Sequence, residues 1–214
     1  MELGDSFGYF VYAFASFFII VNPVEATVVF ISLTRGLDQM ERRHICRRTT
    51  TVAFIMAMLF ALGGEMLLGF FQITIDSLRV AGGILLFLVA VDMLRAKQPK
   101  KVTEAELLDA NEREDVSVFP LATPLLTGPG AITTIIILMG AATVLAEKAI
   151  VLAAMTATFL LTYVILRSSD LINRILGLTG ILVLTRIMGL VLGAISVDFV
   201  ARGAFNLYVE MAGI

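Results

Sequence analysis

The chain has 214 residues, of which 58% are hydrophobic and 16% are charged, and its mean hydropathy is +0.93. This balance is typical of an integral membrane protein and excludes a soluble, charge-rich fold. The formal net charge is -2, and the single cysteine, Cys46, excludes an intrachain disulfide and a cysteine-based metal site.

Apolar segments separated by short polar ones predict an all-α membrane protein with six transmembrane helices. Each segment has roughly 17 to 29 residues, enough to cross ~30 Å of hydrocarbon. The predicted spans are 7–33, 49–71, 78–94, 116–144, 149–166 and 171–195. A last stretch, 196–214, has apolar residues at helical spacing and either extends the sixth helix or lies at the membrane interface.

The first span carries Asn22-Pro23 and then Glu25 at its middle. Pro23 removes the backbone donor that would bond the carbonyl of Ile19, and its ring clashes with the preceding turn. Unpaired backbone groups are costly in hydrocarbon, so such a break persists only where protein, water or a ligand satisfies them. We therefore predict that the first span is broken and that a half-helix begins at Pro23.

The fourth span is interrupted in the same way at Gly128-Pro129-Gly130. Pro129 frees the carbonyl of Leu125, and two further prolines, Pro120 and Pro124, lie earlier in the same span. The sequence therefore predicts broken first and fourth helices.

Each predicted half-helix begins with N–H groups that carry the positive end of the helix dipole and attract an anion. The half-helix before each break ends in free carbonyls, which attract a cation, so a zwitterion with a carboxylate and an ammonium group on one carbon fits both. We predict that the free amides belong to Val24, Glu25, Ala26, Gly130, Ala131 and Ile132. The candidate substrate-binding residues are Asn22, Pro23, Val24, Glu25, Ala26, Thr27, Thr127, Gly128, Pro129, Gly130, Ala131 and Thr133.

Two charged residues within the spans are candidates for ion coupling or cavity lining. Glu25 either completes an N-cap arrangement with Asn22 or binds the substrate ammonium or a proton. Arg186 lies deep in the predicted sixth span and needs a partner or a water-filled cavity. Its candidate partners are Glu25, Glu65 and Asp92.

The two halves of the chain look like copies of one three-span unit. Besides the paired breaks, "AGGILLFLVAVDML" (81–94) matches "LTGILVLTRIMGLV" (178–191), although Gly-Ile-Leu strings also recur by chance in apolar helices. Three is odd, so the second copy enters the membrane from the opposite side and the repeats are inverted. The predicted divisions are 1–96 and 116–195 for the repeats, 97–115 for a charged loop and 196–214 for the final segment.

Arginine and lysine are retained on the cytoplasmic side of membranes, and here they concentrate in loops one, three and five. We therefore expect 36–48, 95–115 and 167–174 to be cytoplasmic and both termini to be extracytoplasmic. Within the third loop, Thr103-Glu104-Ala105-Glu106 predicts a capping box at the start of a short helix.

These features resemble the MarC family of integral membrane proteins, which is related to SnatA-type transporters of small neutral amino acids. The matching segments are Asn22-Pro23-Val24, "LRVAGGILLFLVAVDML" (78–94) and "FPLATPLLTGPGAITT" (119–134).

The resemblance implies six spans in two inverted repeats, with substrate bound near the broken first and fourth helices. Asn22, Gly128, Pro129 and Gly130 carry over onto that pattern. Glu25 departs from the commonest form, which has a small residue after Asn-Pro-x, and an extra carboxylate changes the size and charge of the pocket.

The sequence thus predicts a secondary transporter in the plasma (inner) membrane that moves a glycine- or alanine-like amino acid by alternating access. Protons or sodium are the candidate coupling ions, and the lipid bilayer is the surrounding partner. No enzymatic constellation, cofactor, metal site or nucleic-acid partner is predicted, and the oligomeric state is left open. A passive small-solute channel and a non-transporting membrane scaffold or regulator are the alternative functions.

Overall fold

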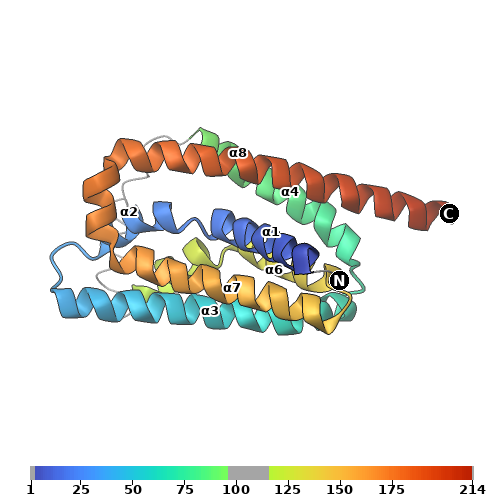
Figure 1. Cartoon of the computed structure of the whole chain (residues 1–214), viewed down its shortest axis with the longest axis horizontal. Helices are drawn as coiled ribbons and strands as arrows, with labels where there is room; N and C mark the ends of the chain where they lie inside the picture. Colours follow the sequence, from blue (N-terminus) through green and yellow to red (C-terminus); the bar gives the residue numbers. More distant parts are fainter. Residues whose placement is uncertain (1–2, 96–115, 214) are drawn as a thin grey trace.

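The computed structural model describes residues 3–95 and 116–213, and these residues contain helices and no strand (Figure 1). The predicted third loop and its short helix at Thr103 lie outside the described residues. The elements are α1 (Leu3–Val21), α2 (Pro23–Leu33), α3 (Gln39–Phe70), α4 (Ile75–Leu94), η1 (Ser117–Leu126), α6 (Pro129–Ala141), α7 (Leu145–Arg167) and α8 (Ser169–Ala212).

In the part of the chain that the structure describes, five helical segments are long and apolar enough to cross a membrane. A sixth span results when η1 and α6, which are bent by 56° across a short break, are counted together. The segment 6–33, which includes most of α1 and all of α2, counts as one of the five. The prediction of an all-helical membrane protein is confirmed at this level.

The third helix begins well before the predicted start of the second span at residue 49. Asp38 caps α3: its carboxylate accepts from the N–H of Glu41 at 2.7 Å, and Glu41 Oε2 accepts from the N–H of Asp38 at 3.1 Å. This capping box starts the helix in its basic, polar stretch. Hydropathy located the apolar part of α3, whereas its capping residues fix where the helix begins.

The last helix, α8, continues through residues 196–212 and is interrupted at Gly177, where φ is 59° and ψ is -179°. Glycine tolerates this positive φ because it has no Cβ. The segment before Gly177 lies across one end of the bundle, and the rest of α8 runs along the bundle (Figure 1). This break was not predicted from the sequence.

The helices form layers, with α1 and α2 between a layer of α3 and α7 and a layer of α4 and α8 (Figure 1). Small residues allow close approach of helices within a membrane. A buried alanine stripe, Ala53, Ala57 and Ala61, runs along α3. Along the antiparallel α4–α8 pair, a Cβ on Gly203 would lie 2.8 Å from the carbonyl oxygen of Asp76.

The α2–α3 and α7–α8 connections lie at one end of the bundle, and the N- and C-termini lie at the other (Figure 1). An ion pair joins helices from the two halves of the chain at each end. Arg42 Nη1 lies 2.7 Å from Asp170 Oδ2 at the first end, which we call the Arg42 end. Lys148 Nζ lies 2.8 Å from Glu65 Oε1 at the opposite end, which we call the Lys148 end.

Candidate functional site

The first candidate element is the junction between α1 and α2 at Asn22. This residue has φ 45° and ψ 59°, a left-handed conformation that asparagine adopts more readily than most residues. The N–H of Asn22 still donates to the carbonyl of Phe18 at 3.1 Å, so α1 is bonded up to the junction. The turn at Asn22 then starts α2 with Pro23 in its first position.

Asn22 and Glu25 are bonded to each other through both side chains. The side-chain Oδ1 of Asn22 accepts from the N–H of Glu25 at 3.4 Å, and its Nδ2 donates to Glu25 Oε2. Asn22 is 9% exposed and Glu25 is partly buried. The structure therefore contains the N-cap arrangement that was one of the two hypotheses for Glu25, and it places a carboxylate in the first turn of α2.

The second candidate element is the junction between η1 and α6 at Thr127 and Gly128. Within η1, Phe119 and Thr123 have extended backbone angles, each immediately before a proline. The buried Thr127 directs both its N–H and its hydroxyl to the carbonyl of Ala122, at 3.0 and 2.9 Å. Gly128 then precedes α6, which begins at Pro129.

The two junctions lie beside each other in the bundle. A Cβ on Gly130, in the first turn of α6, would lie 3.8 Å from Cγ2 of Ile20, in the last turn of α1. The same position would lie 2.9 Å from Cδ2 of Leu86 in α4. The structure thus brings together residues that are more than a hundred positions apart, in a place with little free volume.

Fewer amides at these junctions are free than we predicted. Ala26 N–H donates to the carbonyl of Asn22 and Ile132 N–H to that of Gly128, each at 3.1 Å, and Glu25 N–H is capped by Asn22. The prediction that the amides of Glu25, Ala26 and Ile132 are free is therefore wrong. The carbonyl before a helix accepts from the residue four positions on, so the chain satisfies these donors itself.

At the start of α6, by contrast, Gly130 and Ala131 precede the first intrahelical hydrogen bond, and both residues are buried. Gly128 has no side chain with which to cap them, and no side-chain cap bond is present among the described residues. The positive end of the α6 dipole is therefore uncompensated, while that of α2 already faces the Glu25 carboxylate. The two junctions differ in charge.

Two threonines among the predicted site residues are engaged elsewhere. Thr27 is fully buried, and its hydroxyl donates to the carbonyl of Val24 at 2.6 Å. The γ-methyl of Thr133 occupies the space next to Gly82 in α4. Thr27 therefore supports the first turn of α2, and Thr133 packs at the α4–α6 contact.

The structure does not bring Arg186 to the two junctions. The residue is exposed, and Gly189, one turn further along α8, packs against Met93 in the last turn of α4. Since α4 ends at Leu94, Arg186 lies beyond the end of its antiparallel neighbour. Because α8 continues to Ala212, Arg186 lies in the first half of this helix, and its depth in the membrane stays a prediction.

The carboxylates proposed as partners of Arg186 are also placed elsewhere. Glu25 bonds Asn22, and Glu65 pairs with Lys148 at the Lys148 end. Asp92 is exposed, and no ion pair joins it to Arg186 within residues 3–95 and 116–213. A metal site is not formed either: the described residues hold no group of three or more His, Cys, Asp or Glu side chains able to bind a metal ion.

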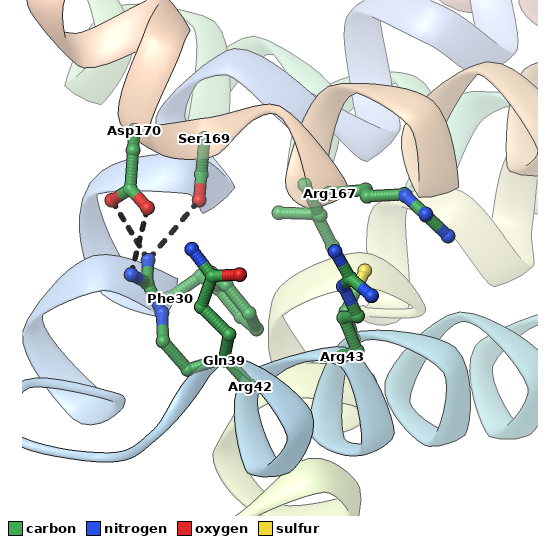
Figure 2. Close-up of a pocket in the computed structure, with 9 residues that line it drawn as sticks. Phe30, Gln39, Arg42, Arg43, Arg167, Ser169 and Asp170 are labelled. Carbon is green, nitrogen blue, oxygen red and sulfur yellow. Dashed lines mark hydrogen bonds and ion pairs between the residues drawn. The ribbon is translucent and has the colours of Figure 1, made fainter.

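A cluster of polar residues at the Arg42 end was not predicted from the sequence. It surrounds a cavity of ≈ 130 Å³ between α2, α3 and the α7–α8 junction (Figure 2). Arg42 donates to both carboxylate oxygens of Asp170, at 2.7 and 2.9 Å, and its guanidinium carbon lies 5.8 Å from the ring centre of Phe30. The signal was present as basic residues in loop one and an acid at the start of the last span. Only the fold shows that they meet.

Comparisons with known proteins agree with the sequence motifs. A family described as MarC family integral membrane protein matches residues 7–208. The chain is 40% identical over 195 residues to a UPF0056 membrane protein of Methanocaldococcus jannaschii, covering 91% of this chain and 95% of the relative. It is 32% identical over 204 residues to the UPF0056 membrane protein YvbG of Bacillus subtilis, covering 94% and 97%. No solved structure matches the chain.

Proposed function

Because this chain belongs to the MarC family of integral membrane proteins, we propose that it is a secondary transporter of small neutral amino acids. The observation that carries the proposal is the buried meeting of two helix junctions of different charge. One presents the carboxylate of Glu25, and the other presents the uncapped start of α6 at Gly130 and Ala131. Broken helices at the middle of a membrane protein are a common way of building a substrate site.

The charge difference gives an orientation for the substrate. Its carboxylate binds the N–H groups at the start of α6, where no acidic side chain competes. Its ammonium binds near Glu25 and the carbonyl of Ile19, which Pro23 leaves without its usual helical donor. This refines the symmetric arrangement expected from the sequence, in which both half-helices share the carboxylate.

The substrate must be small because the junctions are closely packed. Leu86 and Ile20 lie within 4 Å of the Cβ position of Gly130, so a long substrate side chain has no space next to α6. Glycine and alanine fit this restriction. Admitting a larger residue requires Leu86 to move.

The proposal includes two inverted three-helix repeats with broken first and fourth helices, which rock against each other to expose the site alternately to each side. It also includes a location in the plasma membrane with the Arg42 end facing the cytoplasm, as the distribution of arginine and lysine favours. Protons or sodium supply the driving force.

Flux measurements test the proposal directly. Purified protein in proteoliposomes should take up or release labelled glycine and alanine in a saturable manner under a proton or sodium gradient, and should reject leucine. Absence of glycine and alanine flux under both gradients would overturn the proposal. Flux that rises linearly with concentration would indicate a channel instead.

Replacing Glu25 by glutamine tests the coupling role of its carboxylate. The amide oxygen of the introduced glutamine can still accept from Asn22 Nδ2, so the fold should survive, but the side chain can no longer exchange a proton. If protons drive transport through this carboxylate, we expect the acceleration by a pH gradient to fall by about a hundredfold or more, as for loss of a positioned acid–base group. The matched control is Glu210→Gln, on the exposed end of α8. Full pH-driven flux in the Glu25→Gln variant would remove Glu25 from coupling.

A further inference from the structure

The cavity at the Arg42 end has a strongly basic lining that the transport proposal does not use. It is lined by three arginines, Arg42, Arg43 and Arg167, and one carboxylate, Asp170. Other polar lining groups include the Gln39 amide and the Ser169 hydroxyl, which can donate hydrogen bonds. The cavity volume of ≈ 130 Å³ has room for a group of several non-hydrogen atoms.

Within this lining, the carboxylate of Asp170 is already paired with Arg42. It binds Arg42 through both oxygens, and Arg42 also approaches the Ser169 hydroxyl at 3.5 Å (Figure 2). Bidentate pairing of this kind fixes the geometry of both side chains. The side chain of Arg42 is therefore held in one position at the side of the cavity, and the carboxylate of Asp170 balances its charge.

In the part of the chain that the structure describes, no carboxylate pairs with Arg43 or Arg167. Arg43 forms no ion pair within the described residues, and Arg167 donates to the neutral hydroxyl of Tyr163 at 3.1 Å. Both are exposed at the mouth of the cavity. Two guanidinium groups beside a cavity rich in donors suit a phosphate group, whose oxygens accept from several N–H groups at once.

We propose that this cavity binds a phosphate group, with Arg43 and Arg167 as its direct ligands and the Arg42–Asp170 pair as its fixed wall. The first segment of α8, which crosses the end of the bundle before Gly177, points to a phospholipid as the source. Its side chains Leu171 and Ile175 are 57% and 72% exposed, as suits contact with acyl chains beside a bound headgroup. Basic pockets between helices at the cytoplasmic side commonly bind anionic headgroups.

The test compares two double variants with the same change in charge. In Arg43→Gln/Arg167→Gln both proposed ligands are removed, whereas Arg35→Gln/Arg174→Gln removes two arginines that do not line the cavity. Native mass spectrometry of the full chain in neutral detergent measures retention of added phosphatidylglycerol. We expect the first double variant to bind this lipid about tenfold more weakly than wild type and the control to stay close to wild type.

A second arm identifies the source of the phosphate. If the site takes free phosphate, inorganic phosphate should raise the unfolding temperature of the delipidated wild type and of the control, but not of the first double variant. If only phosphatidylglycerol discriminates between the variants, the ligand is a phospholipid. If neither probe distinguishes the two double variants, the proposal is overturned.

Asp170→Asn keeps the proposal testable if the double variant does not fold. Removing this carboxylate frees Arg42 to act as a third ligand, so phosphate-group binding should tighten by about threefold or more. Unchanged or weaker binding in Asp170→Asn would count against the site.

Discussion

Replacing Asn22 by alanine should reduce amino-acid flux by more than about tenfold and lower the stability of the protein. The stability loss has two sources of known size: a lost N-cap costs about 1 kcal/mol, and a left-handed conformation costs an alanine roughly 1–2 kcal/mol. Flux falls because Glu25 loses the Nδ2 donor that holds its carboxylate at the junction. Unfolding temperature in detergent and flux in proteoliposomes measure the two effects separately.

Glycine at the same position separates backbone strain from the function of the side chain. Asn22→Gly accepts φ 45° without strain, so it should retain more stability than Asn22→Ala. Both variants lack the side-chain donor to Glu25, so both should lose flux to a similar extent. Asn173→Ala, on the exposed first segment of α8, is the matched control. An alanine variant as stable as wild type, or a glycine variant with normal flux, would contradict this account of Asn22.

Enlarging Gly83 should separate α4 from α8. A Cβ there would lie 2.7 Å from Val200 Cγ2, 2.9 Å from the carbonyl oxygen of Ser196 and 3.1 Å from the N of Val200. Two of these neighbours are backbone atoms and cannot rotate away, so Gly83→Ala should cost about 1–3 kcal/mol. Gly83→Leu should leave little folded protein.

Gly63 provides the control, because nothing lies within 4 Å of its Cβ position in α3. Gly63→Ala should be neutral or stabilising by up to about 1 kcal/mol, since alanine is the better helix former. Unfolding temperatures of the two alanine variants make the comparison. If Gly83→Ala is as stable as Gly63→Ala, α4 and α8 do not approach each other this closely at Gly83.

The sequence predicted the features that depend on local chemistry. The apolar segments located the helices, and the prolines at 23 and 129 marked where α2 and α6 begin. Asn22 followed by Glu25 indicated a capping arrangement, which the structure contains. Each of these signals is local in the sequence, so no knowledge of tertiary structure is required to interpret it.

The features that could not be predicted depend on contacts between distant segments, or on which backbone N–H groups find an acceptor within the chain. The ion pair between Arg42 and Asp170 joins residues separated by 128 positions, and loop composition does not specify it. Arg186 was placed from the centre of an apolar segment, although α8 runs on to Ala212. The break at Gly177 was missed because a single glycine in an apolar helix is usually tolerated.

The alanine stripe on α3 bears on how the two layers of the bundle move. Ala53, Ala57 and Ala61 have no side-chain rotamers. At these three positions, a displacement of α3 along its axis therefore requires no change of side-chain rotamer on α3. Any displacement of α3 must also break an ion pair near each of its ends, Arg42–Asp170 at one end and Glu65–Lys148 at the other.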